Sequence, residues 1–210
     1  MRRNRLAALL FVFAISPAFG GAYDDILAAA IKGDSAVVER LIRRGMDPNT
    51  ADPTGTTLLM MAARGGNLTL VETLLAQRAS VNRRNQFGDT AVMIAALKGS
   101  EPVVRRLIDA GAELEHEGWT PLHYAVFGGS KEVSNLLIDK GADVDLRAPN
   151  GMTALMLAAR VGNLDMVKLL VEADADYEMT DYEGATARQI ATKLGHSEVA
   201  EYLREAEATQ

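Results

Sequence analysis

Apolar residues recur from residue 23 onward in two alternating patterns. The first is a short run of small and apolar residues around an alanine pair, as in Ala62-Ala63, Ala95-Ala96 and Ala158-Ala159. The second is a pair of apolar residues four positions apart, which puts both side chains on one face of a helix. These pairs are Val37/Leu41, Leu70/Leu74, Val103/Leu107, Val133/Leu137, Met166/Leu170 and Val199/Leu203. The alternation predicts pairs of short helices, the first helix of each pair being small enough to stack closely on its neighbours.

Glycine and threonine positions give the helix pairs a fixed period. The glycines that end the first helix of each pair are spaced by 33 residues, with one interval of 30: Gly33, Gly66, Gly99, Gly129, Gly162 and Gly195. A Gly-x-Thr step precedes each such helix and provides its expected N-cap, Thr57, Thr90, Thr120, Thr153 and Thr186, with Asp24 in the equivalent place at the front. Such a period predicts a repeat solenoid in which no unit buries its apolar face alone.

The connection that follows each second helix also repeats. Gly45, Gly111 and Gly141 occupy one position and are expected to adopt a left-handed turn. Arg78 and Asp174 stand in the same position, where a left-handed backbone costs on the order of 1 kcal/mol for a residue with a Cβ. The residues that lead from this turn to the next Gly-x-Thr step are enough for a hairpin-like connection.

The motif Gly118-Trp119-Thr120-Pro121-Leu122-His123-Tyr124-Ala125 resembles the Gly-x-Thr-Pro-Leu-His-x-Ala signature of ankyrin repeats. The resemblance covers residues 23–210 as about six units, including a degenerate first one and a last one without its hairpin, at roughly 23–54, 55–87, 88–117, 118–150, 151–183 and 184–210. It implies an all-α repeat solenoid with hairpin-like fingers and a concave surface, and it implies a protein-binding scaffold without catalytic residues. Other residues replace the signature proline and histidine in several units, which weakens single motifs without breaking the period.

Residues 1–22 have the order of a secretory signal peptide. A positive head with Arg2, Arg3 and Arg5 precedes an apolar run over 6–15, and small residues then offer a cleavage site after Gly20 or after Ala22. The apolar run is shorter than the ~20 residues that span a bilayer, so a permanent membrane tether is the weaker alternative. The sequence therefore predicts a chain exported to the periplasm or secreted.

Charge and cysteine content exclude several classes of function. Removing residues 1–22 takes away three of the 22 basic residues and leaves 19 against 28 acidic ones, a net charge of −9. An acidic chain repels phosphate backbones, so nucleic acid is not an expected partner. The chain has no cysteine, which excludes disulfides, thiol nucleophiles, cysteine-ligated zinc and a lipid-modified N-terminus.

The three histidines offer little catalytic chemistry. His123 and His196 match scaffold positions of the ankyrin family, whereas His116 lies between Glu115 and Glu117 in a connection. A Glu-His-Glu cluster is a candidate for a divalent metal, but three adjacent residues rarely converge on one ion. Neither a nucleophile–histidine–acid pattern nor a phosphate-binding loop is present. We expect no enzyme activity, no metal and no cofactor, with a metal-dependent hydrolase as a remote alternative.

The repeat register indicates which residues lie together on the concave surface that the resemblance implies. The residue before each N-cap threonine, the residue before the finger glycine and the residue near the end of the first helix are expected to face outward. These columns bring together a candidate protein-binding set of Phe87, Leu97, Trp119, Phe127 and Met152, flanked by Arg64 and Arg160. Aromatic and arginine side chains dominate many interfaces. In the alternative interpretation, the only tryptophan packs against a neighbouring finger.

A three-residue deletion between Ala112 and Gly118 is expected to shorten one finger beside Trp119. The sequence thus predicts a monomeric, exported protein-interaction module that binds a protein partner through its concave surface. A secreted effector that binds a host protein would use the same surface.

Overall fold

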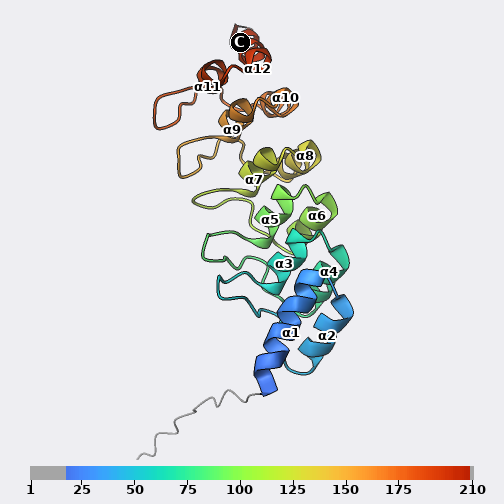
Figure 1. The fold of residues 1–210 in the computed structure, drawn as a ribbon. Helices are drawn as coiled ribbons and strands as arrows, with labels where there is room; N and C mark the ends of the chain where they lie inside the picture. Colours follow the sequence, from blue (N-terminus) through green and yellow to red (C-terminus); the bar gives the residue numbers. More distant parts are fainter. Residues whose placement is uncertain (1–17, 209–210) are drawn as a thin grey trace, which may run out of the picture.

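The computed structural model describes residues 18–208, which form an elongated stack of helix pairs (Figure 1). Within this range there are twelve helices and no strand, only an isolated antiparallel bridge between Ala51 and Thr57. Long connections project from one side of the stack as fingers, and successive pairs follow one another from the blue end to the red end of the ribbon. The predicted all-α solenoid is confirmed.

Each pair consists of an inner helix beside the fingers and an outer helix behind it (Figure 1). The inner helices are α1 (Ala18–Lys32), α3 (Leu58–Arg64), α5 (Ala91–Leu97), α7 (Pro121–Gly128), α9 (Ala154–Val161) and α11 (Ala187–Leu194). The outer helices are α2 (Ser35–Arg43), α4 (Leu68–Ala76), α6 (Glu101–Asp109), α8 (Lys131–Asp139), α10 (Leu164–Glu172) and α12 (Ser197–Ala208). Substantial contacts join only helices of the same or of adjacent pairs.

The predicted threonine N-caps are confirmed. Each threonine hydroxyl accepts a hydrogen bond from the backbone N–H three residues later, in α3, α5, α7, α9 and α11. In four of these helices the side chain three residues later accepts the threonine N–H in return. The acceptor is Nδ1 of His123, Oε1 of Gln189, or the sulfur of Met60 and Met93. Methionine therefore completes the capping box in two units where the signature histidine is missing.

The expected N-cap role of Asp24 is wrong. Helix α1 begins at Ala18, so Asp24 lies within the helix rather than before it. The later units have a glycine with positive φ two residues before the cap, as at Gly55 (φ 78°), but Ala22 stands in that place in the first unit. With no left-handed residue to break it, the helix continues upstream.

The predicted signal peptide lies largely outside the described residues. Residues 18–22 are the part of it that the structure describes, and they form the start of α1. Tyr23, the first residue after either predicted cleavage site that carries a large side chain, donates its hydroxyl to the carbonyl of Ala51 at 2.8 Å. This bond attaches α1 to the first finger.

The predicted left-handed positions after the outer helices are confirmed. Gly45, Gly111 and Gly141 have φ of 102°, 86° and 88°, and Arg78 and Asp174 have φ of 63° and 62°. The two residues with a Cβ thus carry the backbone strain that the repeat register indicated.

Replacing Asp174 by glycine is expected to raise the free energy of unfolding by about 1 kcal/mol, because glycine adopts this backbone without a steric penalty. Urea unfolding followed by circular dichroism measures the change. The matched control is Ala173→Gly, at the neighbouring cap with φ −92°. This substitution should not raise the free energy of unfolding. Equal effects of the two substitutions would contradict the strain at Asp174.

Polar side chains link successive units in a regular way. Asn49, Asn82 and Asp145 each accept a hydrogen bond from a backbone N–H 31 residues later, at 2.7–3.0 Å. Between them the interior is apolar: most of the side chains at the predicted i, i+4 positions are buried, with Val37 only half-buried. The bonds keep adjacent connections in register while the helices bury their apolar faces.

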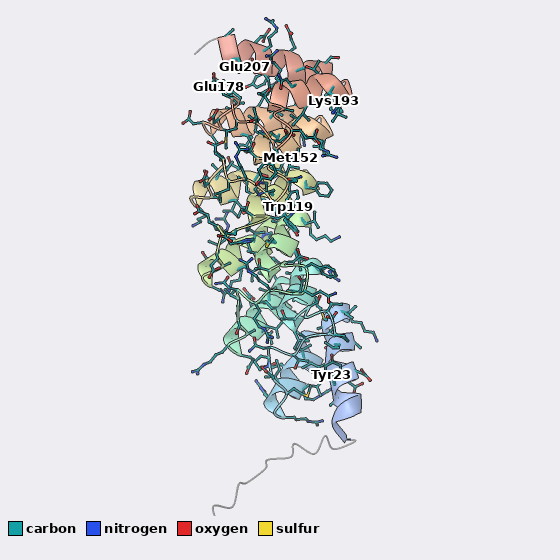
Figure 2. All side chains as sticks on the ribbon, turned by 90° about the vertical axis from the view of Figure 1, so that its left-hand side faces the viewer. Tyr23, Trp119, Met152, Glu178, Lys193 and Glu207 are labelled. Atoms are coloured by element: carbon teal, nitrogen blue, oxygen red, sulfur yellow. The ribbon has the colours of Figure 1, made fainter. Side chains whose placement is uncertain are left out.

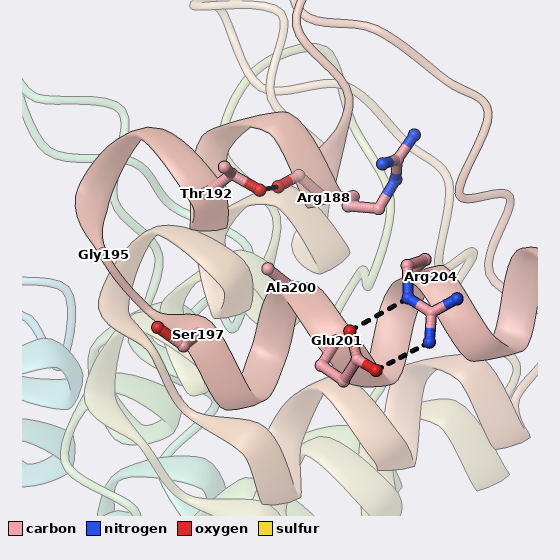
Figure 3. A pocket seen from close by; sticks show the side chains of 7 residues that line it. All are labelled: Arg188, Thr192, Gly195, Ser197, Ala200, Glu201 and Arg204. Atoms are coloured by element: carbon pink, nitrogen blue, oxygen red, sulfur yellow. Dashed lines mark hydrogen bonds and ion pairs between the residues drawn. The ribbon is translucent and has the colours of Figure 1, made fainter.

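The last unit presents a polar face at the C-terminal end of the stack (Figure 3). A hollow of about 280 Å³ lies between α11 and α12, and Arg204 pairs with Glu201 across 2.6 Å beside it. Arg188 pairs with Glu207 at 2.8 Å. A polar outer face is typical of the unit at the end of a repeat stack.

Candidate protein-binding surface

The fingers take their shape from short polar turns. In three units an Asp or Asn three residues before the finger glycine accepts two backbone N–H groups through Oδ1: Asp52, Asn85 and Asp181. Burial alone would raise the pKa of Asp52, but the hydrogen bonds from Thr54 and Thr56 outweigh it and lower the pKa. These Asx turns hold the finger tips without a β-sheet. The sequence signal for these turns is the acidic or amide residue that the three units share at this position.

An apolar recess lies at the middle of the stack, between α5, α7 and the base of the third finger, which joins α6 to α7. It has a volume of about 280 Å³ and is lined by Leu97, Trp119, His123, Tyr124 and Phe127. Phe127 is 65% exposed, while Leu97 and Trp119 are half-buried. Figure 2 shows Trp119 on the finger-bearing side of the molecule, midway along the stack. Three residues of the predicted binding set therefore meet in one place.

His123 forms the floor of this recess. The backbone N–H of Thr120 donates to His123 Nδ1 at 3.1 Å, so the proton is on Nε2, which donates to the carbonyl of Met152 at 3.3 Å. Burial lowers the pKa of His123 to about 4 despite the hydrogen bond to Met152. The neutral imidazole thus joins two consecutive fingers, as expected of a scaffold residue.

The indole ring of Trp119 packs against this imidazole. Its ring meets His123 edge to face, with ring centroids 5.6 Å apart and an interplanar angle of 84°. The ring therefore packs on His123 of its own unit, whereas the alternative interpretation placed it against a neighbouring finger. The remaining surface of the ring lines the open recess. A side chain that is held in place on one side and accessible on the other loses little conformational entropy when it binds.

Tyr124 closes the recess toward the second finger, which joins α4 to α5. Its hydroxyl donates a short hydrogen bond to Asp89, which lies 35 residues earlier. Burial, together with this bond and the charge of Asp89, raises the pKa of Tyr124. Tyr124 occupies the variable position of the repeat signature, so the sequence offered no signal for its role.

Gly128 brings the two walls of the recess together. A Cβ on Gly128 would lie 2.4 Å from the carbonyl oxygen of Leu97, so α7 approaches the end of α5 more closely than any other side chain would permit. The equivalent Gly65 has ordinary contacts of 3.6 Å. The close approach falls in the unit that follows the shortened finger, and it places Phe127 next to Leu97.

Gly128→Ala is expected to lower the free energy of unfolding by about 1–2 kcal/mol, because backbone atoms would have to move apart to accept the methyl group. The matched control Gly65→Ala should be neutral or slightly stabilising, since alanine favours helix. Chemical denaturation of both variants measures the difference. A Gly128→Ala protein as stable as the control would refute the close approach.

The remaining residues of the predicted binding set do not line the recess. Arg64 and Arg160 are exposed at the ends of α3 and α9. Phe87 is 71% exposed at the tip of the second finger and does not line the recess.

The expectation that Met152 faces outward is wrong. Its side chain is only 4% exposed, and its sulfur lies 3.8 Å from Arg160 Nη1. The finger position before the threonine does not point outward in every unit, because Thr56 is buried as well. Met152 instead lines a second hollow of about 330 Å³, whose wall includes the basic Arg160 and Lys193 and the acidic Asp181 and Glu183.

The candidate metal site at His116 gains no support. Its Nδ1 lies 2.8 Å from the carbonyl of Glu117 and 3.2 Å from Arg84 Nη1, and its Nε2 is buried without a hydrogen-bond partner. Over residues 18–208, no three acidic or histidine side chains group closely enough to hold a metal ion. In the same range, every helix is too short or too polar to cross a bilayer.

Comparison with known proteins agrees with the helix pairs and caps. The family model described as "Ankyrin repeats (3 copies)" matches residues 26–114, 59–148 and 142–210. The mouse (Mus musculus) ankyrin repeat and SOCS box protein 11 is 47% identical over 57 residues, 26% of this chain and 18% of that protein. Mouse 2-5A-dependent ribonuclease is 41% identical over 59 residues, 26% of this chain and 8% of that protein. The matched segment is thus a small part of these relatives, and the family model covers nearly all of the described residues. The chain belongs to the ankyrin-repeat family.

Proposed function

We propose that this chain is an exported, non-enzymatic interaction module that binds a protein partner through its concave surface, centred on the recess of Leu97, Trp119 and Phe127. Ankyrin repeats generally mediate protein–protein interaction. The observation that supports this location is an open apolar recess lined by three aromatic side chains besides its histidine floor. Isolated exposed apolar residues are common on proteins, but a hollowed aromatic cluster on the finger side is typical of a binding site.

Export to the periplasm is part of the proposal and rests on the N-terminal residues. The positive head, the apolar run and the small residues up to Ala22 support cleavage after Gly20 or Ala22. Either cut would shorten α1 at its start and keep Tyr23, whose hydroxyl bonds to the first finger. Cell fractionation followed by N-terminal sequencing tests this step. A mature chain that retains residues 1–17 at a membrane would instead support the tethered scaffold, and a chain found in the medium would support a secreted effector.

The binding test uses the signal-less chain as bait in an extract of the compartment where it is found. We expect a retained protein that is lost when the bait carries Trp119→Ala and Phe127→Ala together. Lys131→Ala and Lys140→Ala, both exposed at or beside the outer helix α8, form the control bait and should retain it. A partner that binds both baits equally would remove the recess from the proposal.

A further inference from the structure

The charged residues at the ends of the inner helices are all basic. Inner helices carry exposed basic residues in or just after their last turn: Lys32, Arg64, Lys98, Arg160 and Lys193. No acidic residue occupies the last position of an inner helix or the position on either side of it. Together with the exposed Phe127, Val161 and Leu194 and the half-buried Leu97, these residues form what we call the basic–apolar stripe.

The stripe is not explained by helix stability alone. A basic side chain near a helix C-terminus gains about 0.3–1 kcal/mol from the helix dipole. The outer helices have the same dipole but mixed ends: α2 ends in Arg43, whereas α6, α8 and α10 end in Asp109, Asp139 and Glu172. A dipole effect would favour basic residues on both sets of helices. The inner helix ends thus carry basic charge only, whereas the outer helix ends carry both signs, in a chain with a net charge of −6.

The stripe cations are available for a partner. The ion pairs between described residues involve Arg43, Arg105, Arg188 and Arg204, none of which belongs to the stripe. Arg64 lies near Asp52 closely enough to lower the pKa of that carboxyl, but the first causes there are burial and the bonds from Thr54 and Thr56. Arg160 touches only the Met152 sulfur through its guanidinium. Such charges attract anions most strongly where a hollow limits the solvent around them.

We propose that the partner presents an extended segment with one bulky apolar side chain and acidic side chains on either side of it; this inference rests on the proposed function. The apolar side chain enters the recess of Leu97, Trp119 and Phe127. The acidic side chains face Arg160 and Lys193 in one direction and Lys98 and Arg64 in the other.

The repeat spacing sets where the acidic residues fall. Packed helices are separated by about 10 Å, and an extended chain advances about 3.3 Å per residue. One unit therefore corresponds to about three residues of the segment. We expect acidic residues about three and six positions from the apolar anchor, which matches Arg160 and Lys193 one and two units beyond α7.

The experiment selects binders from a displayed library of random peptides of about 15 residues, which reach about 50 Å when extended. Binding of selected peptides to the parent chain and to its variants is then measured by isothermal titration calorimetry. We expect enrichment of peptides with an apolar residue flanked by Asp or Glu, and an affinity that falls about tenfold when salt is raised from low to high concentration. Enriched peptides without an acidic excess would overturn the inference.

Charge reversal provides the matched comparison. Arg160→Glu with Lys193→Glu should weaken the acidic peptides about tenfold or more. Lys131→Glu with Lys140→Glu changes the net charge by the same amount on the outer side and should have little effect. Equal losses in both variants would indicate net charge rather than the stripe and would overturn the inference.

Two further outcomes separate this inference from the proposed function. Selected peptides that bind Trp119→Ala as well as the parent chain would contradict the recess, and with it the proposed function. Stripe-dependent binding of phosphatidylglycerol vesicles or of random single-stranded DNA, without any peptide binding, would overturn the assignment of the stripe to a protein segment.

Discussion

Trp119→Ala is expected to weaken binding of the protein partner about 100-fold, a loss of about 2.7 kcal/mol. Trp119 is already held against His123 with centroids 5.6 Å apart, so its ordering cost is met before the partner arrives. Its free surface lines a recess whose other walls are Leu97, Tyr124 and Phe127. Removal of the indole would eliminate one aromatic wall of the recess and leave its neighbours facing water.

Isothermal titration calorimetry with the captured partner measures this loss, and circular dichroism verifies that the variant remains folded. Tyr202→Ala serves as the control, because Tyr202 is a half-buried aromatic residue on α12, packed near Lys168 of α10 at 5.7 Å. The control should bind like the parent chain. An affinity for Trp119→Ala within threefold of the parent would contradict the central place of the recess.

Acidification is expected to destabilise the middle of the stack through His123. The pKa of His123 is lowered to about 4 in the folded chain by burial, while the unfolded chain has the ordinary value near 6.5. The unfolded state therefore takes up a proton first as pH falls. The contribution of neutral His123 is fully present above pH 6.5 and is lost progressively between pH 6.5 and 4, up to a maximum of about 3 kcal/mol.

The matched variant for this effect is His123→Gln. Gln189 already fills the equivalent position in the last unit, where its Oε1 accepts the N–H of Thr186 at 3.0 Å, so glutamine suits the cap and does not titrate. Urea unfolding at pH 7, 5.5 and 4.5 should show a steeper loss of stability in the parent chain than in His123→Gln. Parallel pH profiles would show that His123 is not the group responsible.

The repeat period made most of the fold predictable. Threonine caps, left-handed glycines and even the strained Arg78 and Asp174 follow from local backbone chemistry, which depends on neighbours within a few residues. Asp24 failed because the prediction transferred the cap from the later units without their preceding glycine. The N-cap needs both a polar residue and a glycine two positions before it, and the first unit has only the polar residue.

The surface was less predictable because it depends on contacts between units. Leu97 and Phe127 occupy equivalent positions of adjacent units, and Trp119 lies just before the N-cap of α7, so the three meet as the register indicated. Met152 has the same register as Trp119, but its side chain is buried beside Arg160 of its own unit. The close approach of Gly128 to Leu97 was also missed: a second glycine at a helix end resembles an ordinary termination, and the distance between helices is not encoded in one residue.

Contacts restricted to adjacent helix pairs have a consequence for the dynamics of the whole chain. The first and last pairs have a neighbour on one side only, so amide protons of α1 and α12 should exchange with deuterium before those of α5 and α7. Local unfolding of the helix pairs would therefore spread inward from both ends of the stack. A ligand clamped across α5, α7 and α9 would block that spread, and slowed exchange in helices it never touches would report its arrival.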